Sequence, residues 1–266
     1  MKQVTATVIA KGERITGLNR PHERSIRFSQ TIRLNCPEIE KPEPGQFVMV
    51  RCGDECVLPR PFSIHQVTNR EDLTLYFAAL ENGKGTDWLS QRKVGDKIEL
   101  IGPMGKGFSI YPTSHNLLLI AGGMGVASLY FLAEENTRKG YSITTLYGGA
   151  IRNPYIEGLF TPDVKLIIAT ENGSSGHKGL ITDLLPEHAD RADQIFACGP
   201  LPMYKAMAQM PELKGKPVQV SLEVRMGCGR GVCYGCTVKT KQGLKQVCQD
   251  GPVFNLGDIL WDELSY

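Results

Sequence analysis

The stretch Met226-Gly-Cys228-Gly-Arg-Gly-Val-Cys233-Tyr-Gly-Cys236, followed by Cys248, decides how the C-terminal part of the chain folds. Its cysteines are spaced C-x4-C-x2-C, and the fourth comes after eleven intervening residues. This is the plant-type spacing of a [2Fe-2S] site, which needs four thiolates. Glycines between the cysteines let the backbone turn tightly and bring its N–H groups to the sulfurs. The sequence therefore predicts a [2Fe-2S] cluster bound by Cys228, Cys233, Cys236 and Cys248.

A structural zinc site is the alternative for these cysteines. Zinc ligands usually form two separated halves with two to four residues between the members of a pair. Here three cysteines lie in one glycine-rich loop, which favours the iron–sulfur cluster. Disulfides are not expected, because Met1–Ala6 has no apolar signal-peptide core and the cell interior is then the default compartment. We expect a cytoplasmic protein.

Composition indicates a globular protein without a nucleic-acid-binding or membrane-spanning character. The 266 residues are 41% hydrophobic and 22% charged, and the net charge is +2. This charge is too small to predict binding to nucleic acid or to a membrane surface. No apolar run reaches the roughly 18 residues that a membrane span needs. The length accommodates more than one domain.

Four further cysteines lie outside the cluster motif: Cys36, Cys52, Cys56 and Cys198. Cys52 and Cys56 are close in sequence, but no His or further Cys nearby would complete a metal site. We expect them to be loop thiols that behave as small apolar groups.

Residues 1–112 are expected to form a small antiparallel β-barrel. Short segments with alternating or continuous apolar residues are separated by turns, as in such barrels. The expected strands are Val4–Ile9, Ser25–Leu34, Phe47–Arg51, Arg60–Ile64, Leu73–Ala78 and Lys97–Ile101.

Two motifs of this first segment indicate a ligand. In Arg60-Pro61-Phe62-Ser63 a proline of fixed φ stands between a guanidinium and a hydroxyl, so both polar groups leave the strand in defined directions. Gly83-Lys84-Gly85-Thr86 is a glycine loop that enters a helix, with Thr86 as its expected cap. The N–H groups at a helix start suit a pyrophosphate. An ordinary turn is the alternative for the second motif.

Residues 113–220 alternate between apolar strands and helices, which predicts a doubly wound parallel sheet. The expected strands are Leu117–Ala121, Ser142–Tyr147, Val164–Thr170, Gln194–Cys198 and Pro217–Leu222. The expected helices are Leu129–Lys139, Lys178–Leu185 and Leu201–Met210.

Three loops lie at the carboxyl ends of these strands, where the ligands of such sheets gather: Gly122–Gly125, Thr170-Glu171-Asn172-Gly173 and Cys198–Pro200. The first and the last together indicate a nucleotide. Gly122-Gly123-Met124-Gly125 opens a helix, and Cys198-Gly199-Pro200 follows a later strand. The glycine loop departs from the full dinucleotide fingerprint, because Ser128 stands at its last position and no acid follows about 20 residues on. Arg152 is a candidate for a 2′-phosphate, with a solvated loop charge as its alternative, so NAD and NADP both stay open.

Residues 221–266 are expected to form a small cluster-binding lobe. Thr237–Thr240, a Gln242-Gly243 turn and Leu244–Val247 form a hairpin that delivers Cys248. So short a segment has a meagre core, and the cluster is expected to supply much of its folding free energy.

The order of these motifs along nearly the whole chain resembles the electron-transfer subunits of NAD-dependent (class 1B) dihydroorotate dehydrogenases, in the ferredoxin-reductase superfamily. The strings that carry the resemblance are Arg60–Ser63, Gly83–Thr86, Gly102–Gly105, Gly122–Gly125, Ala197–Met203, Ser221–Met226 and Val247–Phe254. A tyrosine–arginine pair that is common on the flavin strand of the family is missing.

The resemblance implies FAD, one [2Fe-2S] cluster, NAD and an FMN-containing catalytic partner subunit, in a heterotetramer. It implies three regions, at 1–112 for FAD, 113–220 for NAD and 221–266 for the cluster. The implied FAD contacts are Arg60, Pro61, Phe62, Ser63, Ala78, Ala79, Leu80, Gly85 and Thr86. The implied NAD contacts are Gly122, Gly123, Gly125, Cys198, Gly199 and Pro200, with the cysteine end at the nicotinamide. His65 is expected at the surface, at a strand end, rather than against the flavin.

The implied reaction is an electron relay. The partner oxidises dihydroorotate on its FMN, the cluster passes single electrons to FAD, and FAD reduces NAD+ by hydride transfer. The cofactors carry this chemistry, so no catalytic acid or base is expected on the chain. The alternatives are a reductase subunit of another complex, such as a sulfhydrogenase or a ferredoxin:NAD(P) oxidoreductase, and, outside enzymes, a zinc-stabilised scaffold.

Overall fold

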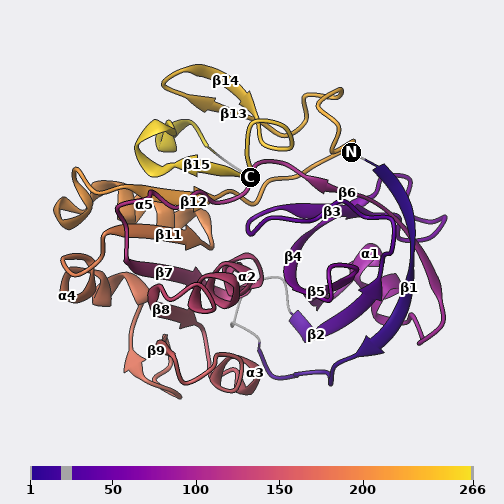
Figure 1. Ribbon diagram of the computed structural model, residues 1–266, viewed down its shortest axis with the longest axis horizontal. Helices are drawn as coiled ribbons and strands as arrows, with labels where there is room; N and C mark the ends of the chain where they lie inside the picture. Colours follow the sequence, from indigo (N-terminus) through magenta and orange to yellow (C-terminus); the bar gives the residue numbers. More distant parts are fainter. Residues whose placement is uncertain (1, 19–25, 265–266) are drawn as a thin grey trace.

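The computed structural model describes residues 2–18 and 26–264, and its first six strands close into a barrel (Figure 1). Every neighbouring pair is antiparallel, in the order β1-β2-β5-β4-β3-β6 around the barrel, so the predicted barrel is confirmed. The helix α1 (Lys84–Ser90) follows the fifth strand. The strands are β1 (Lys2–Lys11), β2 (Ile26–Asn35), β3 (Phe47–Val50), β4 (Arg60–Thr68), β5 (Asp72–Leu80) and β6 (Lys97–Met104).

The interior of the barrel is apolar and includes three thiols. Cys36, Cys52 and Cys56 are buried there among aliphatic side chains such as Ile32 and Leu75. Burial raises the pKa of Cys52 to about 12, and the neighbouring Cys56 adds to this shift. The three thiols are therefore buried packing groups, as expected from their small size.

The second part is a seven-stranded sheet, ordered β10-β9-β8-β7-β11-β12-β15, in which six strands are parallel and the last is antiparallel. The order reverses around β7, as in doubly wound folds, which confirms the predicted fold class. The parallel strands are β7 (Asn116–Gly122), β8 (Ser142–Gly149), β9 (Val164–Thr170), β10 (His177–Lys178), β11 (Gln194–Cys198) and β12 (Val218–Ser221). The helices are α2 (Val126–Thr137), α3 (Pro154–Glu157), α4 (Leu185–Ala189) and α5 (Leu201–Gln209).

The predicted helix Lys178–Leu185 was wrong in its bounds, and the predicted cap of α1 was wrong in its residue. The segment predicted as a helix from Lys178 begins in β10, continues through the 3-10 turn η2 (Ile181–Leu184) and becomes α-helical in α4. Pro186 explains this start, because its missing N–H is tolerated in the first turn of a helix. Thr86 is not the cap of α1, because Gly83 occupies that position and the Thr86 hydroxyl donates to the Gly83 carbonyl at 3.1 Å.

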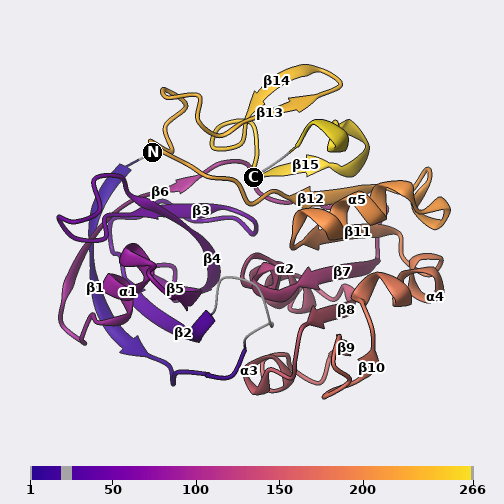
Figure 2. The same ribbon diagram turned by 180° about the vertical axis from the view of Figure 1, so that it is seen from behind.

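The C-terminal segment lies across both larger parts (Figure 2). The predicted hairpin is present as β13 (Thr237–Thr240) and β14 (Gly243–Gln246), and β15 (Val253–Asn255) adds an antiparallel strand beside β12. The tail then packs on α5, where the Trp261 ring stacks on Tyr204 at 5.3 Å. The remaining 3-10 turns are η1 (Gly123–Gly125), η3 (Pro211–Leu213), η4 (Leu256–Asp258) and η5 (Trp261–Glu263).

His65 lies buried between the barrel and the sheet, so the prediction of a surface residue was wrong. Its side chain is 1% exposed, and its ring stacks on Tyr130 of α2 at 4.7 Å. The residue follows the Arg60–Ser63 motif on β4, and the α2 helix packs directly against this strand. The side chain is buried by contact between the barrel and the sheet part, and the pattern of residues along a strand does not predict such contacts.

In the described part of the chain, no helix has the length and apolarity to cross a membrane.

Candidate functional site

The cysteine loop is folded by glycines and rests on the barrel. Gly229 and Gly231 adopt φ of +68° and +74°, which strongly favour glycine. A Cβ added at Gly229 would lie 2.6 Å from Cγ of Met49 on β3, so the loop backbone packs directly on a barrel strand. The loop also reaches the 52–59 segment, since a Cβ at Gly227 would contact Leu58 at 4.0 Å.

The four predicted ligands form two neighbouring pairs of thiols. The Cys228 and Cys233 side chains lie within hydrogen-bonding reach of each other, and so do those of Cys236 and Cys248. Cys228 also acts electrostatically on Cys248, so the two pairs are adjacent. Within the described residues, no three His, Cys, Asp or Glu side chains surround a single point as ligands of one metal ion would. Two adjacent thiol pairs fit a two-iron cluster, which takes two ligands on each iron.

Backbone N–H groups of the loop point at these sulfurs. Burial opposes ionisation of Cys228, but N–H groups of Arg230, Cys233 and Val232 outweigh it and lower the pKa of Cys228 to about 6. The Arg230 N–H lies 3.3 Å from the Cys228 Sγ. Burial raises the pKa of Cys248 to about 12, although the Gly231 N–H favours its thiolate. Hydrogen bonds of this kind orient and tune the thiolates of iron–sulfur sites.

The predicted nucleotide loops meet at the carboxyl ends of β7 and β11. A Cβ at Gly125 would lie 1.9 Å from the Cys198 carbonyl oxygen, and one at Gly122 would lie 2.6 Å from Cδ of Pro200. Glycine at both positions is therefore what allows the loops to approach each other. The structure brings together the six residues predicted for NAD: Gly122, Gly123, Gly125, Cys198, Gly199 and Pro200.

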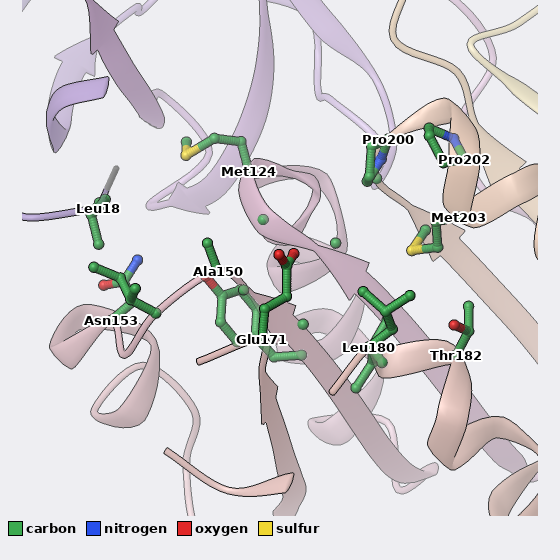
Figure 3. Close-up of a pocket in the computed structure, with 18 of the residues that line it drawn as sticks. Leu18, Met124, Ala150, Asn153, Glu171, Leu180, Thr182, Pro200, Pro202 and Met203 are labelled. Carbon is green, nitrogen blue, oxygen red and sulfur yellow. The ribbon is translucent and has the colours of Figure 1, made fainter. Parts of the chain in front are cut away.

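A cavity of about 550 Å³ opens at this junction (Figure 3). Gly122, Gly123, Gly199 and Pro200 line it, and so do residues at the ends of β8 and β9. Its size is within the range of small-molecule and cofactor sites. Glu171 belongs to Thr170-Glu171-Asn172-Gly173, which the sequence placed at a strand end where ligands gather, and it lines the cavity. The sequence reasoning missed Ala150 and Glu223 as cavity residues, because their position at the cavity depends on the sheet order.

Cys198 and Glu223 form a close pair at one end of the cavity. The Cys198 Sγ lies 3.8 Å from Oε1 of Glu223, which lines the cavity and is reached by water through it. Protein atoms that surround Glu223 raise the pKa of its carboxyl group, and those around Cys198, together with the Glu223 charge, raise the pKa of the thiol. The chain leads from the end of β12 through Glu223 into the cysteine loop, so this pair lies on the side of the cavity from which the chain continues to the cluster site.

The residues predicted for FAD lie on β4, β5 and α1 of the barrel, and none of them lines this cavity. Arg60 and Gly85 are in contact, because a Cβ at Gly85 would lie 2.8 Å from Cγ of Arg60. The hydrogen-bonded pairing of β4 with β5 begins with Thr68 opposite Asp72 and ends with Ile64 opposite Leu75.

The residues of these two strands that were predicted for FAD lie past this end of the pairing. Arg60 and Pro61 pair with β3, and Ala78, Ala79 and Leu80 pair with β2. Thr86 Oγ1 accepts from the Leu80 N–H at 3.5 Å, which ties the glycine loop to β5.

These barrel residues fit a flavin dinucleotide in their chemistry. A half-buried guanidinium and a half-buried hydroxyl, from Arg60 and Ser63, lie on one strand, and a glycine loop at a helix start touches the guanidinium. A cation and backbone N–H groups at a helix start are the donors that a pyrophosphate requires. Their contact with FAD stays a prediction.

Comparison with known proteins agrees with this geometry. Residues 223–260 match the family model described as the iron-sulfur cluster binding domain of dihydroorotate dehydrogenase B. The chain is 36% identical over 226 residues to the dihydroorotate dehydrogenase B (NAD(+)) electron transfer subunit of Geobacillus thermodenitrificans, covering 82% of this chain and 87% of the relative. The chain belongs to the family of dihydroorotate dehydrogenase B electron transfer subunits. A Desulforamulus reducens relative with the same description is 36% identical and covers 87% of this chain and 92% of its own length.

Solved structures share the fold of this electron transfer subunit family. One, described in connection with flavin-based electron bifurcation by the NADH-dependent reduced ferredoxin-NADP oxidoreductase, matches with a TM-score of 0.80 and 27% identity, over 97% of this chain and 91% of that one. A ferredoxin NADP+ reductase from Neisseria gonorrhoeae with bound FAD and NADP matches with a TM-score of 0.61 at 16% identity, over 79% of this chain and 90% of that one. The second likeness concerns the fold alone.

Proposed function

We propose that this chain carries electrons from dihydroorotate oxidation, performed by an FMN-containing partner subunit, to NAD+. The observation that carries the proposal is the arrangement of the four cysteines as two adjacent pairs of thiols. The loop that holds three of them rests on the barrel and follows Glu223, which lines the nucleotide cavity. One chain thus joins a cluster site to a dinucleotide site. The family to which the chain belongs supports the same reaction.

The bound groups would supply the redox chemistry: the cluster exchanges single electrons, FAD exchanges one or two, and NAD+ accepts a hydride. The chain's residues bind and orient them. Cys228, Cys233, Cys236 and Cys248 hold the cluster, and their backbone donors stabilise its sulfurs. Arg60, Ser63 and the glycine loop at Gly85 hold FAD, while the cavity between β7 and β11 holds NAD.

Electrons enter, in this proposal, at the exposed edge of the cysteine loop. Cys233 is exposed, and its neighbours Val232 and Tyr234 are 73% and 69% exposed. Cys236 and Cys248 are buried, so the loop presents one side of the cluster site to the surface and the other to the protein.

We propose a heterotetramer of two such chains and two catalytic subunits, which native mass spectrometry would test.

The proposal is tested by purifying the chain anaerobically with its catalytic partner and measuring its cofactors and its electron donor. We expect two iron and two sulfide ions per chain. We also expect FAD to be released on denaturation and NADH to be formed when dihydroorotate is supplied. A colourless protein with stoichiometric zinc would contradict the proposal and support the zinc-stabilised scaffold.

A second candidate is a reductase subunit that exchanges electrons with ferredoxin. The structural match to the NADH-dependent reduced ferredoxin-NADP oxidoreductase, over 97% of the chain, favours it. The same purified complex distinguishes the two functions. NADH formation with reduced ferredoxin, and none with dihydroorotate, would support this candidate over the first.

A further inference from the structure

We propose that Glu171 selects NAD(H) over NADP(H) by accepting hydrogen bonds from the adenosine ribose hydroxyls, while Glu157 holds Arg152 away from a 2′-phosphate. The inference rests on the proposed function in assigning the cavity to a pyridine dinucleotide. It adds the residue that decides which dinucleotide binds.

Glu171 is fixed at the edge of the cavity by the backbone of a neighbouring strand. It follows β9 and lines the cavity. Its N–H donates to the Gly149 carbonyl at 3.0 Å, and the next N–H, of Asn172, donates to the Ala150 carbonyl at 3.2 Å. Gly149 and Ala150 line the same cavity at the end of β8. The carboxylate therefore stands beside a stretch of backbone with little side-chain bulk, where a sugar can approach.

The sheet order assigns this edge to the adenosine end of the ligand. The strands run β9-β8-β7-β11-β12, and the glycine loop after β7 is the natural seat of the pyrophosphate. Cys198 and Glu223, after β11 and β12, lie on the side that continues into the cluster loop, so the redox-active ring belongs there. The other half of the dinucleotide then lies over β8 and β9. Figure 3 shows Glu171 beside Ala150 and away from Pro200.

The charges at this edge favour a ribose diol over a phosphate. Among the described residues that line the cavity there is no Lys, Arg or His, and the carboxylates are Glu171 and Glu223. A carboxylate accepts hydrogen bonds from ribose hydroxyls, as acids do in NAD sites, whereas it repels a 2′-phosphate. The usual sequence rule seeks this acid on the second strand, about 20 residues after the glycine loop. Here the third strand supplies it.

Arg152, the cation that the sequence offered for a 2′-phosphate, is already bound to a carboxylate. The Arg152 Nε lies 3.0 and 2.9 Å from the two carboxylate oxygens of Glu157, and its Nη2 lies 2.6 Å from Oε2. Ser175 donates to the same carboxylate at 2.8 Å, and the Arg152 N–H donates to Ser174 Oγ at 2.7 Å. The two guanidinium nitrogens that would bind a phosphate in a bidentate manner therefore already donate to Glu157. Arg152 was expected either to contact a 2′-phosphate or to be a solvated loop charge. In the structure its guanidinium is instead paired with the Glu157 carboxylate.

Isothermal titration with ADP-ribose and 2′-phospho-ADP-ribose tests the inference without electron transfer, because neither probe carries the nicotinamide. The protein is the cofactor-loaded complex with its partner subunit. The wild type is expected to bind ADP-ribose at least about tenfold more tightly, since like charges in contact are strongly unfavourable. Glu171→Gln should weaken ADP-ribose binding and strengthen 2′-phospho-ADP-ribose binding. Adding Glu157→Gln should strengthen the latter further by releasing Arg152.

Glu187→Gln is the matched control, because Glu187 is an exposed acid on α4 that does not line the cavity. Its ratio of affinities should equal that of the wild type. The inference is overturned if the wild type binds both probes with equal affinity. It is also overturned if Glu171→Gln leaves the ratio of the two affinities unchanged, including by weakening both equally. Either result leaves the proposed function intact. Binding of neither probe contradicts the dinucleotide cavity, and with it the proposed function. Unchanged FAD and iron content shows that each variant is folded.

Discussion

The His65 Nε2 lies 2.8 Å from the Tyr155 hydroxyl, and this contact joins the barrel to the sheet domain. The other ring nitrogen, Nδ1, lies 3.0 Å from the Ala127 carbonyl oxygen. A carbonyl can only accept, so Nδ1 carries a hydrogen, and in the neutral imidazole Nε2 then accepts from the Tyr155 hydroxyl. Around this pair Asn153 donates to the Tyr76 hydroxyl at 3.2 Å. The interface between the barrel and the sheet is therefore a polar network, and burial keeps its imidazole neutral by lowering the pKa of His65.

This network predicts that acid weakens the protein. Burial lowers the pKa of His65 from 6.5 to about 4, although its bond to Ala127 acts in the opposite direction. The unfolded chain takes up the proton near pH 6.5 and the folded chain only near 4. The free energy of unfolding should therefore fall across this interval, by about 3 kcal/mol from His65.

Denaturant titration of wild type and His65→Gln between pH 7.5 and 4 checks this. The variant loses the ring stacking and should be less stable at pH 7.5 by about 2 kcal/mol. Its stability should then depend less on pH than that of the wild type. Parallel pH profiles for the two proteins would contradict a neutral His65 at the interface.

Gly125→Ala is expected to disrupt the nucleotide site. The new Cβ would lie 1.9 Å from the Cys198 carbonyl oxygen, and backbone on both sides must shift. We expect the affinity for NADH to fall by about tenfold or more, since a small displacement of a binding loop misplaces several contacts. Fluorescence titration measures it. Gly257→Ala is the control, because nothing lies within 4 Å of its Cβ. Equal affinities in both variants would show that the close approach of the two loops is not needed.

Gly229→Ala is expected to lift the cysteine loop from the barrel. The residue has φ of +68°, and its Cβ would lie 2.6 Å from Met49 and 3.3 Å from Met104. The left-handed backbone alone costs about 1 kcal/mol or more. We expect faster loss of iron to a chelator. Gly235→Ala in the same loop is the control, because its Cβ meets Cys233 at an ordinary 3.6 Å. Identical rates of iron loss would exclude packing on the barrel as a source of cluster stability.

The sequence predicted the architecture because its signals are local. Apolar periodicity located the six barrel strands and the parallel strands, and the cysteine spacing located the thiols that the structure pairs. The glycine loop and the Cys198 loop were predicted to lie on either side of one dinucleotide, and the structure brings them into contact.

The remaining features depend on which segments become neighbours. Glu171 faces the cavity because β9 lies beside β8, and no spacing rule from the glycine loop predicts that position. His65 reads as the exposed end of a strand until α2 packs over it. Glu223 lines the cavity because β12 lies next to β11. The burial of His65 and the roles of Glu171 and Glu223 at the cavity were missed because burial between domains and sheet order are set by tertiary structure.

The most direct test of the electron-transfer account is NADH formation from dihydroorotate by the complex that carries Cys233→Ser. Removing the exposed thiolate should abolish the visible absorbance of the cluster and the formation of NADH, while FAD stays bound. Tyr234→Phe, a change at the neighbouring exposed residue, should keep both signals and serves as the control. Wild-type rates of NADH formation by Cys233→Ser would contradict electron transfer through the cysteine loop.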